Sequence, residues 1–171
     1  MSTDALHIHA FIASRIDYCN AVLHGVTATR SFGDFRQCFN HAATRLIIGI
    51  GQNDHSTPTS LWDTLHWLPV SQRIIFKIAL MTYDCISGRS PAYFRYVSVP
   101  VVSVPSRSRL RSADNDDMIV PRTRTIRYGP RSFRVVAPQI WNTLPSHLKN
   151  INISREQFKS GLRTWLIVQA Y

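Results

Sequence analysis

Five of the nine prolines fall between residues 91 and 136, and they divide the chain into parts that must fold differently. Proline lacks a backbone N–H and clashes with the preceding turn, so neither a long helix nor a central strand can run through this segment. Before it, apolar residues recur at helical spacings over residues 5–88. We therefore expect a mainly α protein, with a helical bundle over residues 5–88 and an irregular extension over residues 89–171.

Four amphipathic segments make up the expected bundle, each with apolar residues at mostly helical spacings. The first runs over residues 6–23 and the second over residues 32–47, and glycines follow both. A third, short helix is interrupted by Pro69, and Ser71 is expected to cap a fourth that ends at Gly88. The apolar stripe of the fourth consists of Ile74, Ile75, Ile78, Met81, Cys85 and Ile86. Helices of this kind bury their stripes against one another.

The sequence of the extension predicts shorter elements than those of the bundle. Residues 118–120 and 123–128 are typical of two short strands, which would form a hairpin turning near Pro121. Residues 132–141 predict a short helix broken by Pro138.

The chain ends in the best-defined helical signal of the sequence. Ser154 has Gln157 three residues later, which is the spacing of a capping box. We expect an amphipathic helix over residues 154–169. Its apolar face carries Phe158, Leu162, Trp165 and Leu166.

The net charge is +10, from 20 Lys and Arg against 10 Asp and Glu, and 17 of the 20 are Arg. Such a balance draws a protein to polyanions. Arginine binds phosphate through a planar, bidentate fork, and in an extended chain alternate residues share one side. We therefore expect nucleic-acid contacts from the eight arginines of the proline-rich region. They are Arg107, Arg109, Arg111, Arg122, Arg124, Arg127, Arg131 and Arg134.

Aromatic residues interleave with these arginines: Tyr128 and Phe133 are candidates for stacking on bases. The competing interpretation is a solvated loop whose charge is partly offset by Asp114, Asp116 and Asp117.

No catalytic, metal or cofactor site is predicted. The Asp116–Asp117 pair suggests a magnesium site, but no third carboxylate accompanies it, so a solvated turn is favoured. The seven histidines and three cysteines show no zinc-like spacing, and no serine or cysteine has the setting of a nucleophile. No apolar stretch approaches the roughly 20 residues that cross a bilayer, and the N-terminus is unlike a secretory signal. The odd number of widely spaced cysteines favours the cytoplasm or nucleus.

Short motifs in a fixed order resemble one family. They include SRIDYCN at residues 14–20, NHAATRLIIG at 40–49, LHWLPVSQRIIF at 65–76, RLRS at 109–112 and WNTLP at 141–145. Together they resemble the C-terminal region of non-LTR retrotransposon reverse transcriptases, in the jockey-like or chicken-repeat-like branch. The resemblance spans about residues 5–167.

This resemblance implies the helical thumb and the extension beyond it, which hold the template–primer in such polymerases. The family's fingers, its palm with the aspartate pair and its endonuclease have no counterpart in this sequence, so no catalytic residue carries over. We expect a truncated reading frame whose product binds RNA or DNA, as template–primer or target, through the backbone and is not an enzyme alone. Trp67 and Trp141 are expected to form structural corners.

Two other interpretations stay open. In one, the bundle stripe that the missing palm would cover meets a protein partner or a second copy of the chain. In the other, the chain is the remnant of a decayed element and has no function.

Overall fold

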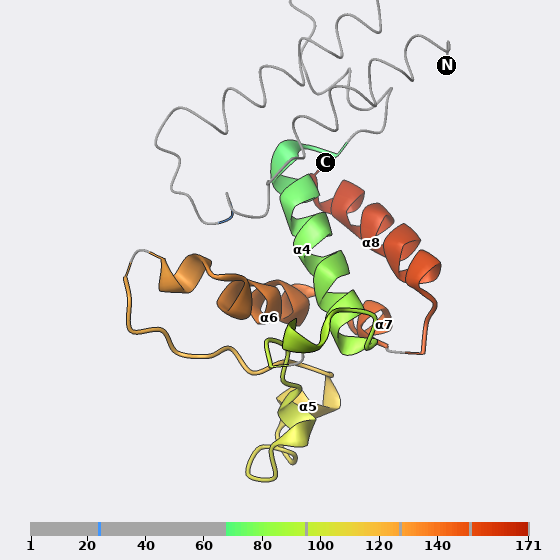
Figure 1. The fold of residues 1–171 in the computed structure, drawn as a ribbon. Coiled ribbons are helices and arrows are strands. Elements are labelled where there is room, and N and C mark those ends of the chain that lie inside the picture. Colours follow the sequence, from blue (N-terminus) through green and yellow to red (C-terminus); the bar gives the residue numbers. More distant parts are fainter. Residues whose placement is uncertain (1–23, 25–67, 95, 127, 151, 171) are drawn as a thin grey trace, which may run out of the picture. The chain divides into compact units, whose positions relative to one another are not determined.

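The computed structural model describes residue 24 and residues 68–94, 96–126, 128–150 and 152–170. The three helices expected before residue 68, and the corner at Trp67, lie outside these residues. The chain divides into two compact units, and residues 75–169 belong to one of them. The described part of the chain is mainly helical and contains no strand (Figure 1). None of its helices is long and apolar enough to cross a membrane.

Helix α4, Val70–Ile86, is the fourth helix of the expected bundle. It begins one residue before the predicted cap and is followed by Gly88, whose φ of 70° is the left-handed conformation that favours glycine. Its buried side is rotated from the predicted stripe, because Thr82 is buried while Met81 is 41% exposed. The Thr82 hydroxyl is satisfied within the helix, since Oγ1 donates to the Ile78 carbonyl at 2.7 Å. Burial also raises the pKa of the Cys85 thiol.

Helix α8, Arg155–Ala170, confirms the predicted C-terminal helix. The capping box is formed: the Ser154 N–H donates to Gln157 Oε1 at 2.8 Å, and the Gln157 N–H donates to Ser154 Oγ at 3.2 Å. Three of the four predicted apolar residues are fully buried. They are Phe158, Leu162 and Leu166.

Helices α4 and α8 lie side by side (Figure 1), joined by aromatic and charged contacts. The rings of Tyr83 and Phe158 stack with centroids 4.5 Å apart, and the Tyr83 hydroxyl donates to the Ile153 carbonyl. Arg155 binds both carboxylate oxygens of Asp84, with Nε to Oδ1 at 2.9 Å and the second contact at 3.1 Å. This hydrogen-bonded pairing raises the pKa of the Arg155 guanidinium. The pair joins the end of one helix to the start of the other.

Helix α6, Phe133–Thr143, runs unbroken through Pro138, so the predicted break is wrong. Proline at this position removes one helical hydrogen bond, the one that would reach the carbonyl of Arg134 near the exposed start of the helix. The compensation is burial, because Pro138 lies among the fully buried side chains. The centroids of Trp141, near the end of this helix, and Phe158 are 6.0 Å apart, which brings α6 against α8.

Short elements connect the three long helices. They are the 3-10 turns Ala92–Phe94 (η2), Val101–Ser103 (η3) and Gly129–Arg131 (η4), and the short helices Arg111–Asp114 (α5) and Ser146–Lys149 (α7). The predicted hairpin is not seen in the described residues. Met118 instead forms an isolated antiparallel bridge with Pro100. A Cβ added at Gly161 would lie 2.7 Å from Leu148 Cδ2, so α7 approaches α8 closely at that glycine.

Phe158 stacks on residues of both α4 and α6, so its removal tests this core. We expect Phe158→Ala to lower the free energy of unfolding by about 3–5 kcal/mol, because it deletes a fully buried ring and leaves a cavity. Urea unfolding followed by circular dichroism measures the change. Val168→Ala on the same helix is the control. Val168 is 73% exposed, so this substitution should change the free energy of unfolding by no more than about 0.5 kcal/mol. Equal effects of the two variants would contradict the packing described.

Candidate nucleic-acid interface

The net positive charge comes from one of the two units. Residues 75–169 contain 15 Lys and Arg against 5 Asp and Glu, whereas the rest of the chain contains five of each. The net charge of +10 therefore belongs to the unit of residues 75–169, which contains most of α4 and the elements after it.

Two of the five acidic residues in this unit are engaged in ion pairs that hold the fold. Asp84 is bound to Arg155, as described above. Asp117 accepts from the Lys149 ammonium at 2.7 Å, and the lysine side chain is only 5% exposed. The prediction of a solvated turn is therefore wrong for Asp117, although its neighbour Asp116 is exposed, with a φ of 53°.

The segment Asp116–Met118 is fixed by side chains of α6 and α7, and we call this set of contacts the anchor. The Trp141 indole N–H donates to the Asp116 carbonyl at 3.0 Å. The Asn142 side chain accepts from the Met118 N–H at 2.8 Å and donates to the Met118 carbonyl at 3.0 Å. Lys149 adds a bond of 3.1 Å to the Asn142 carbonyl. Trp141 is 1% exposed, as expected of a structural corner.

The anchor separates two groups of arginines. Arg107, Arg109 and Arg111 precede it and form the first group. Arg122, Arg124, Arg131 and Arg134 follow it and form the second. The eighth predicted residue, Arg127, lies outside the described residues.

The first group does not lie on an extended chain. The N–H groups of Val104, Arg107, Leu110 and Ala113 each donate to the carbonyl three residues earlier, at 2.8–3.1 Å. This succession of turns removes the strand-like alternation predicted for Arg107 to Arg111, since only an extended chain places every second residue on one side. The three arginines are nevertheless exposed.

The second group is carried in part by a chain that turns back on itself. A Cβ added at Gly129 would lie 2.5 Å from Thr125 Oγ1 and 2.7 Å from Thr123 Cβ, so both threonines lie against the glycine backbone. Arg122 and Arg124 alternate with these threonines and are exposed. Arg134 is exposed in the first turn of α6, whereas Arg131 is half-buried.

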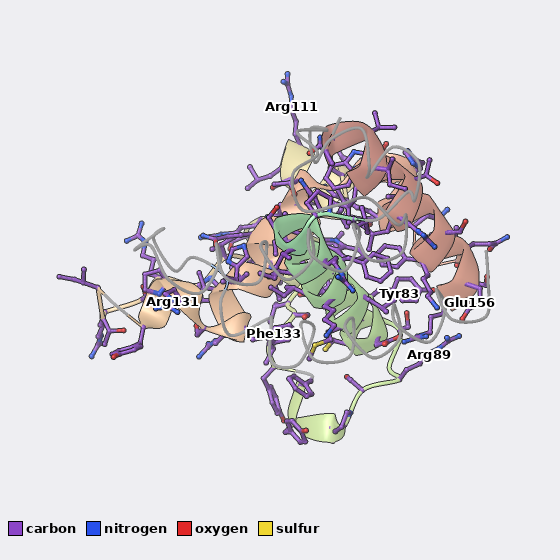
Figure 2. All side chains as sticks on the ribbon, turned by 90° about the horizontal axis from the view of Figure 1, so that it is seen from above. Tyr83, Arg89, Arg111, Arg131, Phe133 and Glu156 are labelled. Carbon is purple, nitrogen blue, oxygen red and sulfur yellow. The ribbon has the colours of Figure 1, made fainter. Side chains whose placement is uncertain are left out.

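The structure does not bring all the predicted arginines together on one face. Figure 2 shows Arg111 and Arg131 on different sides of the unit. Six of the eight are exposed and form no ion pair with any described carboxylate. They are Arg107, Arg109, Arg111, Arg122, Arg124 and Arg134.

The two aromatic candidates differ in their surroundings. Phe133 is half-buried and packs edge-on against Phe94, with centroids 5.6 Å apart and an interplanar angle of 80°. It is therefore a packing residue. Tyr128 is 78% exposed.

One small cavity and the absence of a metal cluster are seen in the described residues. A cavity of about 20 Å³ lies beside the anchor, lined by Pro100, Met118, Trp141 and Lys149 among others. It has room for about one water molecule. No three His, Cys, Asp or Glu side chains in the described part of the chain could hold a metal ion.

Comparisons of the chain with protein-family models, with curated proteins and with solved structures found no match.

The buried ion pair of the anchor can be tested by removing its cation. We expect Lys149→Met to lower the free energy of unfolding by about 3 kcal/mol, because it leaves the Asp117 carboxylate without its partner in a largely buried position. Urea unfolding measures the change. Adding Asp117→Asn to this variant should recover part of the stability, and Asp114→Asn, at an exposed position, is the control. A Lys149→Met variant as stable as the control would show that the pair does not hold the segment.

Proposed function

We propose that the chain binds nucleic acid by ionic contacts to phosphates and catalyses no reaction on its own. The observation that carries the proposal is the set of six exposed arginines that have no partner among the described carboxylates, on a unit of net charge +10. Arginines paired with neighbouring acids would be neutralised within the protein. Unpaired ones remain available to an external polyanion.

The composition of this surface favours phosphate over other anions. The guanidinium group presents a planar fork of donors that matches two phosphate oxygens, whereas a lysine ammonium acts as a point charge. Twelve of the 15 basic residues in the unit are Arg. Contacts to phosphates position a protein on nucleic acid but read no sequence.

We further propose that the chain corresponds to the thumb and C-terminal extension of a non-LTR retrotransposon reverse transcriptase, the region that holds the template–primer. The ordered motifs from residue 14 to residue 145 support this assignment. Trp141 and Asn142 of the WNTLP motif both bond the anchor segment, so these two residues have a structural role in this chain. In this proposal the unit is a holding surface, and the catalytic residues belong to other parts of the polymerase.

Binding to a template–primer should depend steeply on salt. If about five phosphates are contacted in a duplex, the slope of log K against log salt is expected to be roughly −4.5, because each contact releases condensed counterions. Fluorescence anisotropy of a labelled RNA–DNA template–primer between 50 and 200 mM salt (about the range over which such contacts weaken strongly) measures it. A slope near zero, or no binding at low salt, would contradict the proposal.

Replacing arginines of the second group, together with their neighbour Arg127, tests whether they bind phosphates. Arg122→Ala, Arg124→Ala and Arg127→Ala combined should weaken all sequences about equally and reduce the salt slope by roughly 0.9 for each phosphate that is no longer bound. The matched control replaces the same three residues with Lys, which retains the charge and therefore most of the slope. A loss of affinity confined to certain sequences would instead indicate base readout. Oligomers in size-exclusion chromatography at high salt, without any nucleic-acid binding, would favour the self-association alternative.

A further inference from the structure

Residues 122–126 together with Tyr128, which we call the arginine–tyrosine loop, expose apolar side chains close in sequence to positive charge. Ile126 is 94% exposed and Tyr128 is 78% exposed. Arg122 and Arg124 are exposed in the same loop. Figure 1 shows the chain before η4 running as an open loop at the edge of the unit. A tyrosine with an accessible ring face beside unpaired arginines is the combination found where proteins bind unpaired bases.

Packing contacts and hydrogen bonds around Gly129 hold the loop in place. Thr123 and Thr125 lie against the backbone of Gly129, so the chain folds back between Thr125 and Gly129. The Tyr128 carbonyl accepts from the Arg131 N–H at 3.2 Å. The Gly129 carbonyl accepts from the Ser132 hydroxyl at 2.7 Å and from its N–H at 3.1 Å. These bonds tie the tyrosine to the start of α6.

The threonine contacts also bring the arginines near the tyrosine. Arg122 and Arg124 flank Thr123, which lies against Gly129, the residue that follows Tyr128. Both arginine side chains are exposed, so their guanidinium groups are accessible to phosphates.

We propose that the arginine–tyrosine loop binds single-stranded nucleic acid, with Arg122 and Arg124 on phosphates and the Tyr128 ring stacked on an unpaired base. This inference rests on the proposed nucleic-acid binding and names its preferred ligand. A duplex offers the loop phosphates only, since its bases are stacked on each other and present no free face. A single strand offers both phosphates and base faces, and a π-face is common to every base, so the contact requires no particular sequence.

The test compares one oligonucleotide in two forms. The full chain is titrated with a labelled, unstructured single strand and with the same strand annealed to its complement. We expect Tyr128→Ala to weaken single-strand binding by about fivefold or more and to change duplex binding less than twofold. Tyr128→Phe retains the ring and should retain the affinity. Tyr96→Ala is the matched control, because Tyr96 is 82% exposed but lies outside the loop.

The arginine variants separate this inference from the proposed function. Arg122→Ala with Arg124→Ala should weaken both forms, because both present phosphates. If Tyr128→Ala weakens both forms equally, or neither, the stacking contact is overturned while the salt-dependent binding stands. If the unmodified chain binds neither form, both proposals fail. Retained single-strand affinity in the Tyr128→Ala variant, together with loop-dependent binding to anionic lipid vesicles, would assign the loop to a membrane surface and also overturn the inference.

Discussion

The side-chain amide of Asn142 bonds both the N–H and the carbonyl of Met118, and so does for that residue what a neighbouring β-strand would do. A backbone group shielded from water without a partner costs about 1–3 kcal/mol, so a proline-rich segment near the core needs such substitutes. The Trp141 indole serves the Asp116 carbonyl in the same way, and the Lys149 ammonium pairs with the Asp117 carboxylate. These contacts fix an irregular segment against α6 and α7, and the arginine groups on either side are positioned by it.

The ion pairs of the unit follow from the same requirement. Two of its five acidic side chains, Asp84 and Asp117, are committed to holding helix ends and loops, and each is paired with one basic residue. The fold uses Lys149 and Arg155 for this purpose, and both lie outside the proline-rich region. The exposed arginines of that region have no comparable partners among the described carboxylates, so its charge is directed outward. The charges that hold the fold and the exposed charges proposed to bind phosphates are thus carried by different residues.

Features that depend on local interactions could be predicted from the sequence. The capping box at Ser154 and Gln157 involves residues three apart, and the buried face of α8 follows helical periodicity. Features that depend on distant partners could not. The pairing of Asp117 joins residues 32 positions apart, and nothing near the aspartate indicates the lysine. Tertiary burial also kept α6 intact at Pro138, although its local preference favours a break.

The same division applies to the candidate site. The alternation predicted for Arg107 to Arg111 failed, because successive turns replace the extended chain there, and the chain also bends at Arg124. The charge of the arginines predicted that most of them would be exposed, and six of the eight are. The sequence did not predict on which sides of the unit they lie. The anchor lies between the two groups in the sequence, and Arg111 and Arg131 lie on different sides of the unit (Figure 2). Under the proposed function, a unit with arginines on two sides would contact separate strands at once and draw them together, so long nucleic acids would be compacted as well as bound.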